Sequence, residues 1–400
     1  MDPISVYVHF PWCLKKCPYC DFVSFAELRD QIDHRGYADA VIAELSARRG
    51  ALDGRPLRSV FFGGGTPSLW KPDELGRVLG AILEAATKPQ GEEEEIEITV
   101  ECNPTSLDEG RARALKDAGV NRLSVGVQGL DERRLKFLGR LHGPDEGLEA
   151  LRAALRSGMP RVSGDLIYGT FGGAFGAQGG EAEETATEAA AEARAVAATG
   201  VSHVSAYSLT IEPGTQFGEL ARRGKLPIAK EETLVESFVA IEGALEAAGL
   251  EHYEISNYAR PGHESRHNLG YWLGLDYLGL GCGAFGTLGS EDGSAVRYRN
   301  KATPRGYMQA AAAGVSTEES EERLDPETRL RERIMLGLRL RAGLDLEAAA
   351  GPLGLRAFSE GRRRAVEKLV KAGRIEVEGS HVRIPKRAWV FADGIAAELF

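Results

Sequence analysis

The stretch "HFPWCLKKCPYC", residues 9–20, places Cys13, Cys17 and Cys20 within eight positions near the start of a 400-residue chain. The chain contains only five cysteines in all. The segment before them, residues 4–10, has the apolar and β-branched composition of a strand. The three thiols therefore follow directly on the first predicted strand, and spacings of four and three allow one tight loop to aim all three sulfurs at one point.

Three thiolates leave two kinds of metal site open. A tetrahedral zinc site needs a fourth ligand, which His9 or Asp21 could supply. A [4Fe–4S] cluster can instead be held at three irons by protein and keep the fourth iron for a ligand that is not protein. We favour the cluster, because the loop has three cysteines and no fourth.

Bulk composition describes a globular protein with a large core. Hydrophobic residues make up 43% and charged residues 27%, with a formal net charge of −10. This charge argues against nucleic acid as the main partner. No apolar run reaches the roughly 20 residues of a membrane span, and no signal peptide is visible. Crowded cysteines in odd number fit a reducing compartment, so we expect a cytoplasmic protein.

Strand-like and helix-like segments alternate over the first half of the chain. The predicted strands are residues 4–10, 59–62, 97–101, 122–127, 162–167 and 203–209. Helical patterns separate them, and several end in glycine. Six such units predict a parallel sheet, and of the open doubly wound and barrel alternatives we favour a partial (β/α)₆ barrel of the TIM type over residues 1–210.

Polar or glycine-rich features recur where these strands end. The second strand ends in "FFGGGTP", whose glycines allow close approach of a ligand and could offer backbone amides to it. The next three strands carry Glu101, Gln128 and Asp165 at or near their ends. Functional groups of such barrels gather at this rim, so the sequence predicts one site there together with the cysteine loop.

The C-x₃-C-x₂-C spacing resembles the signature of the radical S-adenosylmethionine (radical SAM) superfamily. The resemblance implies that S-adenosylmethionine chelates the open iron and can be cleaved to a 5′-deoxyadenosyl radical. The chain is similar to the coproporphyrinogen III dehydrogenase (HemN-like) branch over nearly its whole length. The matching positions imply cofactor-binding roles for Tyr7, Tyr19, Gly64, Gly65, Thr66, Glu101, Gln128, Arg140 and Asp165.

Two features resemble the haem chaperone family of this branch rather than the dehydrogenases. Phe22 stands where the dehydrogenases have a further cysteine, and "RHNLGYW" contains an H-N-x-x-Y-W motif at His267, Asn268, Tyr271 and Trp272. The resemblance implies haem as cargo, bound by this motif, with haem-acceptor proteins and an electron donor as partners. The alternative is a radical SAM oxidoreductase or methyltransferase that acts on a tetrapyrrole.

Beyond the barrel we expect a connecting αβ segment over 211–320 and a winged-helix-like domain over 321–400, with three helices and a hairpin turning at 378–380. Arg362, Arg363 and Arg364 stand on its third helix, where a DNA reader would lie, and a DNA-binding iron–sulfur regulator is the weakest alternative. We expect Cys102 and Cys282 to be buried small hydrophobes. The glycine-rich stretch 169–184 is longer than the turn that HemN-like proteins have after the fifth strand. We therefore expect this rim loop to cover the site differently from theirs.

Overall fold

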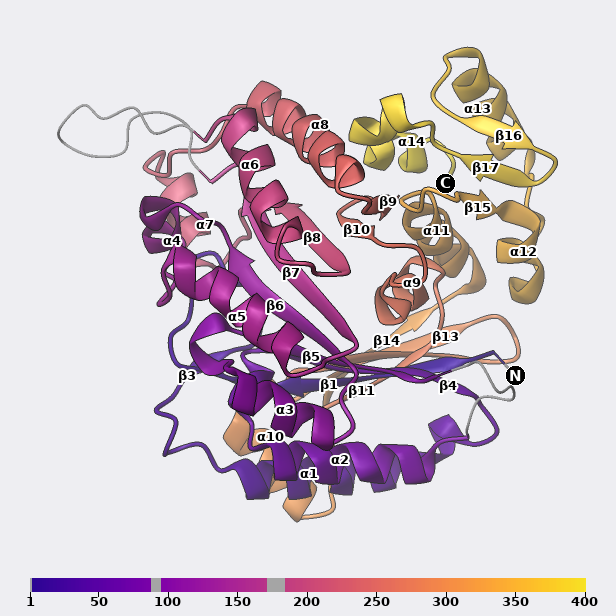
Figure 1. The fold of residues 1–400 in the computed structure, drawn as a ribbon. Coiled ribbons are helices and arrows are strands. Elements are labelled where there is room, and N and C mark those ends of the chain that lie inside the picture. The colour runs from indigo at the N-terminus through magenta and orange to yellow at the C-terminus, as the bar shows by residue number, and fades with distance from the viewer. Residues whose placement is uncertain (1, 88–94, 171–183) are drawn as a thin grey trace.

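Six parallel strands form the centre of the fold in the computed structural model, which describes residues 2–87, 95–170 and 184–400. They lie side by side in chain order, as the sequence predicts (Figure 1). Their bounds are β1 (Ile4–Phe10), β4 (Leu57–Gly64), β5 (Glu97–Cys102), β6 (Arg122–Gln128), β7 (Arg161–Tyr168) and β8 (His203–Ser208). The predicted strands are confirmed to within two residues at each end.

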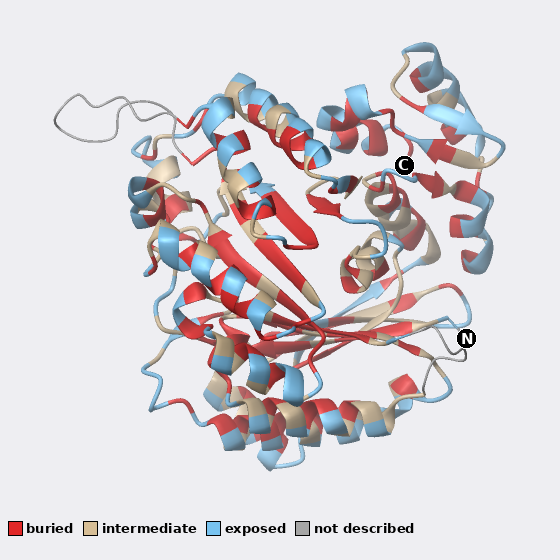
Figure 2. Ribbon diagram, in the orientation of Figure 1, coloured by how far each residue is buried: buried red, intermediate tan, exposed pale blue. Residues whose placement is uncertain are grey.

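Apolar and polar side chains alternate along each strand, and the apolar face packs against the helices. Val6 and Val8 of β1 and Val60 of β4 are fully buried in the main apolar core. Helices cover this outer face: α1 (His34–Arg48), α2 (Pro72–Ala85), α3 (Glu109–Asp117), α5 (Pro144–Arg156), α6 (Ala186–Ala197) and α8 (Glu231–Ala247) (Figures 1 and 2). The intervening side chains, such as Ser5 and Ser59, point to the inner face. The inside of this open barrel is therefore polar and able to hold a polar ligand.

Six later strands extend the same sheet at both edges, and none of them was predicted individually. On one side β10 (Asn257–Ala259) pairs antiparallel with β8 and carries β9 (Glu251–Glu254). On the other side β11 (Tyr277–Leu280) pairs parallel with β1. Antiparallel β12 (Phe285–Gly289), β13 (Ala295–Asn300) and β14 (Glu318–Leu324) follow it. The first strand of the chain is thus an inner strand of a twelve-stranded sheet.

The C-terminal part has its own apolar core and the predicted winged-helix-like order. Helices α11 (Pro326–Gly337), α12 (Leu346–Ala350) and α13 (Glu360–Lys371) precede the hairpin of β16 (Glu376–Glu378) and β17 (His381–Arg383). A third short strand, β15 (Leu344–Asp345), and a last helix, α14 (Ala392–Ala397), were not predicted.

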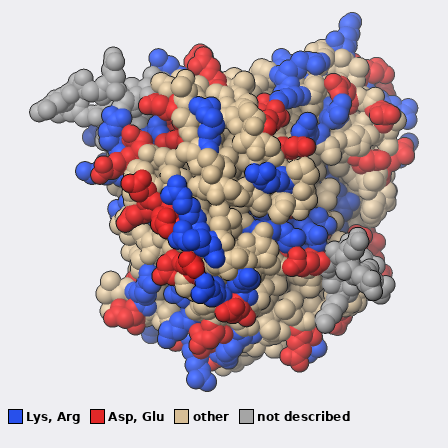
Figure 3. All heavy atoms as spheres, viewed as in Figure 1, with Lys and Arg blue, Asp and Glu red and all other residues tan. Residues whose placement is uncertain are grey.

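Arg362 of the predicted DNA-reading helix is buried. Its guanidinium donates to the carbonyl oxygens of Ala357 and Leu399, so it holds the domain together instead of facing a ligand. Basic and acidic side chains are interspersed over the face of the molecule seen in Figure 3. These observations give the DNA-binding alternative no support.

The remaining elements are short connections. They are β2 (Trp12–Cys13), β3 (Phe25–Ala26), α4 (Glu132–Phe137), α7 (Gln216–Arg222), α9 (Arg266–Trp272), α10 (Pro304–Ala312) and the 3₁₀ turns at Arg49–Leu52, Pro67–Leu69, Pro104–Ser106, Gly351–Leu353 and Lys386–Phe391. Within the described parts of the chain, no helix is both long and apolar enough to cross a membrane. Most of the stretch 169–184 lies outside the described residues.

Glu44 connects α1, the first helix of the barrel, to the strands and loops of residues 281–317. Its carboxylate is 3% exposed and forms an ion pair with Arg48. It also accepts hydrogen bonds from the donors Gly281 N, Asn300 Nδ2, Tyr307 Oη and Thr317 Oγ1, at distances of 2.6–3.1 Å. One buried charge therefore joins α1, the turn after β11, β13, α10 and the segment leading into β14.

We expect Glu44→Gln to lower the free energy of unfolding by about 3 kcal/mol. The amide has one acceptor oxygen instead of two, so some of the buried donors lose their partner, and the ion pair with Arg48 is lost while that of Arg48 with Glu318 remains. Urea unfolding followed by circular dichroism measures the loss. Glu236→Gln, at an exposed position of α8, is the matched control and should change stability by less than about 0.5 kcal/mol. Equal stability of the two variants would contradict the role of Glu44.

Candidate functional site

The cysteine loop lies at the end of β1 and is closed by β2, which pairs with β3. Thr66 Oγ1 donates to Cys13 Sγ at 3.4 Å, and Arg140 Nη1 donates to Cys17 Sγ at 3.7 Å. The pKa of Cys13 is raised to about 11, mainly by burial; the hydrogen bond from Thr66 opposes this rise, and the charges of Cys20 and Cys17 add to it. The three thiols are therefore close enough to influence one another, and two donors point at their sulfurs, Thr66 from the turn after β4 and Arg140 from the segment after α4.

The geometry does not support the zinc alternative. His9 Nε2 donates to Val23 O at 2.7 Å, which leaves Nδ1 to accept from the Tyr7 hydroxyl at 3.0 Å. Burial also lowers the pKa of His9 to about 4, so the imidazole stays neutral. Among residues 2–87, 95–170 and 184–400, no group of three or more His, Cys, Asp or Glu side chains is arranged around a single metal ion. A cubane places its cysteines on separate irons and does not need such convergence.

The glycine turn after β4 packs tightly against the cysteine loop. Gly64 has φ +110°, and a Cβ there would lie 2.4 Å from the His9 ring. A Cβ on Gly65 would lie 2.6 Å from the Trp12 carbonyl oxygen. Glycine is therefore required at both positions, for close approach and, at Gly64, for backbone conformation.

The amides of this turn are already used within the protein, contrary to the expectation that they face a ligand. Gly64 N donates to Glu101 Oε2 at 3.1 Å, and Gly65 N donates to Phe10 O at 2.7 Å. Thr66 N donates to Trp12 O at 2.8 Å. The carbonyl oxygens of the turn could accept hydrogen bonds from an amine ligand, whereas these three N–H groups are already used.

Two carboxyl groups lie on the inner face above the middle of the barrel. Burial, together with the nearby charge of Asp165, raises the pKa of Glu101 to about 8. Asp165 accepts hydrogen bonds from the hydroxyls of Ser124, Ser163 and Ser205 at 2.8–3.0 Å. Burial raises the pKa of Asp165 as well. The serines fix the Asp165 carboxylate, so that both acids can meet the hydroxyl groups of a bound ligand.

Arg140 connects the end of β6 to the cysteine loop. Gln128 has φ +68°, the one positive φ at a non-glycine residue of the described chain, and it sits at a bulge in the pairing of β6 with β7. Arg140 Nη2 donates to Gly126 O at 2.8 Å while Nη1 reaches Cys17. The buried Nε of Arg140 has no hydrogen-bond partner in the described structure. Tyr19 lies within the electrostatic influence of the same guanidinium.

The H-N-x-x-Y-W motif lies on α9 at the opposite end of the barrel. His267 is buried, its backbone N donates to Glu97 Oε1 at 3.0 Å, and its ring stacks on Phe61. The two ring nitrogens hydrogen-bond to Ser59 Oγ at 2.9 Å and to Tyr271 Oη at 3.2 Å. Burial lowers the pKa of His267 to about 3. Because both nitrogens have protein partners, this geometry does not favour His267 as an iron ligand.

The other three motif residues face a cavity of about 480 Å³. Its walls come from α9, α11 and the edge strands β11, β12 and β13, and they also contain Tyr207 of β8. The lining includes Asn268, Tyr271, Trp272, Tyr207, Tyr277, Arg297, Arg329 and Arg333. Sequence reasoning missed Tyr207, Tyr277 and the three arginines, since nothing in their local sequence marks them.

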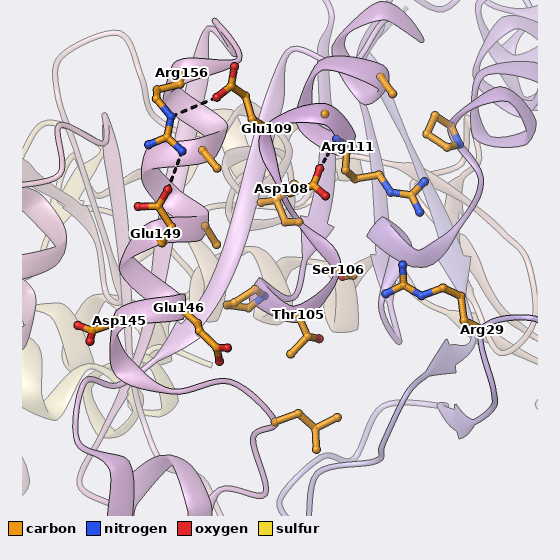
Figure 4. Close-up of a pocket in the computed structure, with 18 residues that line it drawn as sticks. Arg29, Thr105, Ser106, Asp108, Glu109, Arg111, Asp145, Glu146, Glu149 and Arg156 are labelled. Carbon is orange, nitrogen blue, oxygen red and sulfur yellow. Dashed lines mark hydrogen bonds and ion pairs between the residues drawn. The ribbon is translucent and has the colours of Figure 1, made fainter.

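A second, more open hollow of about 1070 Å³ lies outside the barrel between α3 and α5 (Figure 4). Arg156 bridges Glu109 and Glu149 on one wall, and Arg29 and Arg111 stand on the other. None of the predicted site residues lines this hollow. We therefore assign the site to the barrel rim and the α9 cavity.

Comparison with known proteins agrees with this geometry. Residues 7–173 match the family model of the radical SAM superfamily, and residues 324–391 match the HemN C-terminal domain. The "Heme chaperone HemW" of Escherichia coli K12 is 37% identical over 77% of this chain and 76% of its own length. That of Mycobacterium tuberculosis H37Rv is 32% identical over 100% of this chain and 95% of its own length. The chain belongs to the HemW family.

Solved structures place the HemW family chain in a known fold. The radical SAM enzyme coproporphyrinogen III oxidase (HemN) of E. coli superposes with a TM-score of 0.78 at 20% identity, over 99% of this chain and 90% of that one. This match confirms the predicted fold class. Membership of the radical SAM superfamily implies a [4Fe–4S] cluster and S-adenosylmethionine, and the gathered thiols with their two donors fit that cluster.

Proposed function

We propose that this protein is a cytoplasmic haem chaperone that holds a [4Fe–4S] cluster and S-adenosylmethionine at the barrel rim and haem in the α9 cavity. In this proposal haem is the cargo, acceptor proteins receive it, and an electron donor serves the cluster. The observation that carries the proposal is the joint presence, in one HemW family chain, of the three-thiol loop and of a cavity lined by three residues of the H-N-x-x-Y-W motif.

At the rim, Cys13, Cys17 and Cys20 would hold the cluster. When bound, the cluster would supply one electron to the sulfonium of S-adenosylmethionine. Thr66 and Arg140 would donate hydrogen bonds to its cysteine sulfurs, as they do to the thiols now. Carbonyl oxygens of the glycine turn would accept from the methionyl amine, while Tyr7, Glu101 and Asp165 would face the nucleoside.

In the cavity, Tyr271 and Trp272 offer apolar ring faces to a planar macrocycle, and Asn268 offers an edge polar group. The volume of about 480 Å³ falls within the roughly 300–1,000 Å³ typical of cofactor sites. Phe22, at the position of the dehydrogenases' further cysteine, is 55% exposed. Because position 22 is phenylalanine, the loop has no additional thiol for oxidative chemistry, which favours carriage of haem over its synthesis.

Titration of the full-length, anaerobically reconstituted protein with haem tests the proposal. We expect a saturable visible spectrum in the wild type and an affinity at least about tenfold lower for Trp272→Leu, which loses a ring face. Phe391→Leu, an exposed aromatic position outside the cavity, is the matched control. Loaded protein should then pass haem to apomyoglobin.

An unchanged affinity in Trp272→Leu would contradict binding in this cavity. Conversion of coproporphyrinogen III to protoporphyrinogen in the presence of a reductant would instead support the enzyme alternative.

A further inference from the structure

Three arginines line the α9 cavity, and two of them already have partners. Arg297 forms a two-pronged ion pair with Glu332, with distances of 3.0 and 2.7 Å. Arg329 donates to the carbonyl oxygens of Gly293 and Ser294 and approaches Asp276 at 3.5 Å. These two guanidinium groups are therefore committed to holding the edge strands against α11.

Arg333, one turn further along α11, differs from both. Its Nη1 donates to the carbonyl oxygen of Ala349 at 2.8 Å, and its buried Nε has no hydrogen-bond partner in the described structure. No carboxylate of the described chain lies within ion-pair distance of it. Burial and the neighbouring charge of Arg329 lower its pKa, and the charges of Asp2 and Asp276 only partly offset this.

The backbone of α9 is shaped to accept this side chain. Gly274 ends the helix with φ +65°, and a Cβ there would lie 2.7 Å from Arg333 Cγ. The stem of Arg333 thus crosses directly over the end of the helix that carries Tyr271 and Trp272. The cavity combines aromatic side chains with a half-buried guanidinium that has no carboxylate of the described chain within ion-pair distance.

We propose that Arg333 is the carboxylate receptor of the α9 cavity and pairs with a propionate of the bound haem. This inference rests on the proposed function and adds to it the group that recognises the edge of the ligand. A guanidinium fork matches a carboxylate bidentately, and the pair is strongest where water is partly excluded. The cavity would then select a flat apolar ring with a peripheral carboxylate over the same ring without one.

Haem and haem dimethyl ester, which lacks both carboxylates, separate this inference from the proposed function. We expect the wild-type full chain to bind haem about 10- to 100-fold more tightly than the ester. Arg333→Met should lower the affinity for haem to that for the ester and leave the affinity for the ester nearly unchanged. Arg333→Lys, which keeps the charge but loses the fork, should fall between the two.

Arg331→Met is the control, because Arg331 lies on the same helix but is exposed and pairs with Glu327. Thermal unfolding of each variant verifies that it is folded. A preference for haem that survives in Arg333→Met, or its absence in the wild type, would overturn the inference while haem binding itself upheld the proposed function. No binding of haem by the wild type would overturn both.

Discussion

Replacing Cys17 by serine is expected to abolish cluster assembly. Iron bound after anaerobic reconstitution should fall from about four atoms per chain in the wild type to less than about one. A serine hydroxyl is not deprotonated at neutral pH, so the loop would keep two thiolates, and Arg140 Nη1 would lose its sulfur acceptor. Iron and sulfide analysis, together with the visible absorption spectrum, measures the outcome.

Cys282→Ala is the matched control for this experiment. Cys282 is fully buried in the main core, and its removal affects packing without touching the loop. It should retain the iron content of the wild type. A Cys17→Ser protein with full iron content would contradict the assignment of the cluster to this loop.

Replacing Glu101 by glutamine is expected to change ligand affinity and stability in opposite directions. At pH 9, above its pKa of about 8, Glu101 is a carboxylate, whereas the amide still accepts from Gly64 N but brings no charge, so binding of S-adenosylmethionine at this pH should weaken by about 10- to 100-fold. Isothermal titration of the reconstituted protein measures this loss. The stability effect follows from the pKa of about 8 that burial gives this carboxyl.

Its folded-state pKa lies above the ordinary value of 4.5, so the folded protein binds more protons than the unfolded chain between these two pH values. Glu101 therefore makes the wild type less stable as the pH rises from 4.5 through 8. Glu101→Gln removes this contribution and should exceed the wild type in stability by on the order of a few kcal/mol at pH 9, with a smaller difference at pH 5. Urea unfolding at pH 5, 7 and 9 decides the point. A stability difference independent of pH would contradict it.

The central strands could be predicted because their signal is local. Val6 and Val8 alternate with polar side chains that the inner face of the barrel tolerates, and glycines mark the helix ends. The edge strands gave no such signal. Strand β14 is "EESEERL", almost wholly exposed, and is held by pairing with β13 rather than by burial of its own side chains. Strand β11 is four residues long and contains Gly279.

Some residues of the candidate site could likewise be predicted from local sequence, and others could not. The cysteine spacing and the residues at strand ends are features of contiguous sequence, and the structure gathers the thiols, Thr66 and Arg140 at one rim. Two partners of His267 are distant in sequence: Ser59 of β4 lies 208 positions away and Glu97 of β5 lies 170 positions away, and no local pattern predicts these contacts. Arg333 faces Tyr271 and Trp272 only because α11 packs against α9.

The parallel pairing of β1 with β11 also has a consequence for folding during translation. Residues 5–8 leave the ribosome about 270 residues ahead of their partners at 277–280. At typical elongation rates that delay is on the order of ten seconds to a minute. During this time one side of β1 is an open sheet edge in the nascent protein, where pairing with another chain competes with the native partner. Slower initiation, which lowers the number of nascent chains present at one time, should therefore raise the yield of product that is not aggregated.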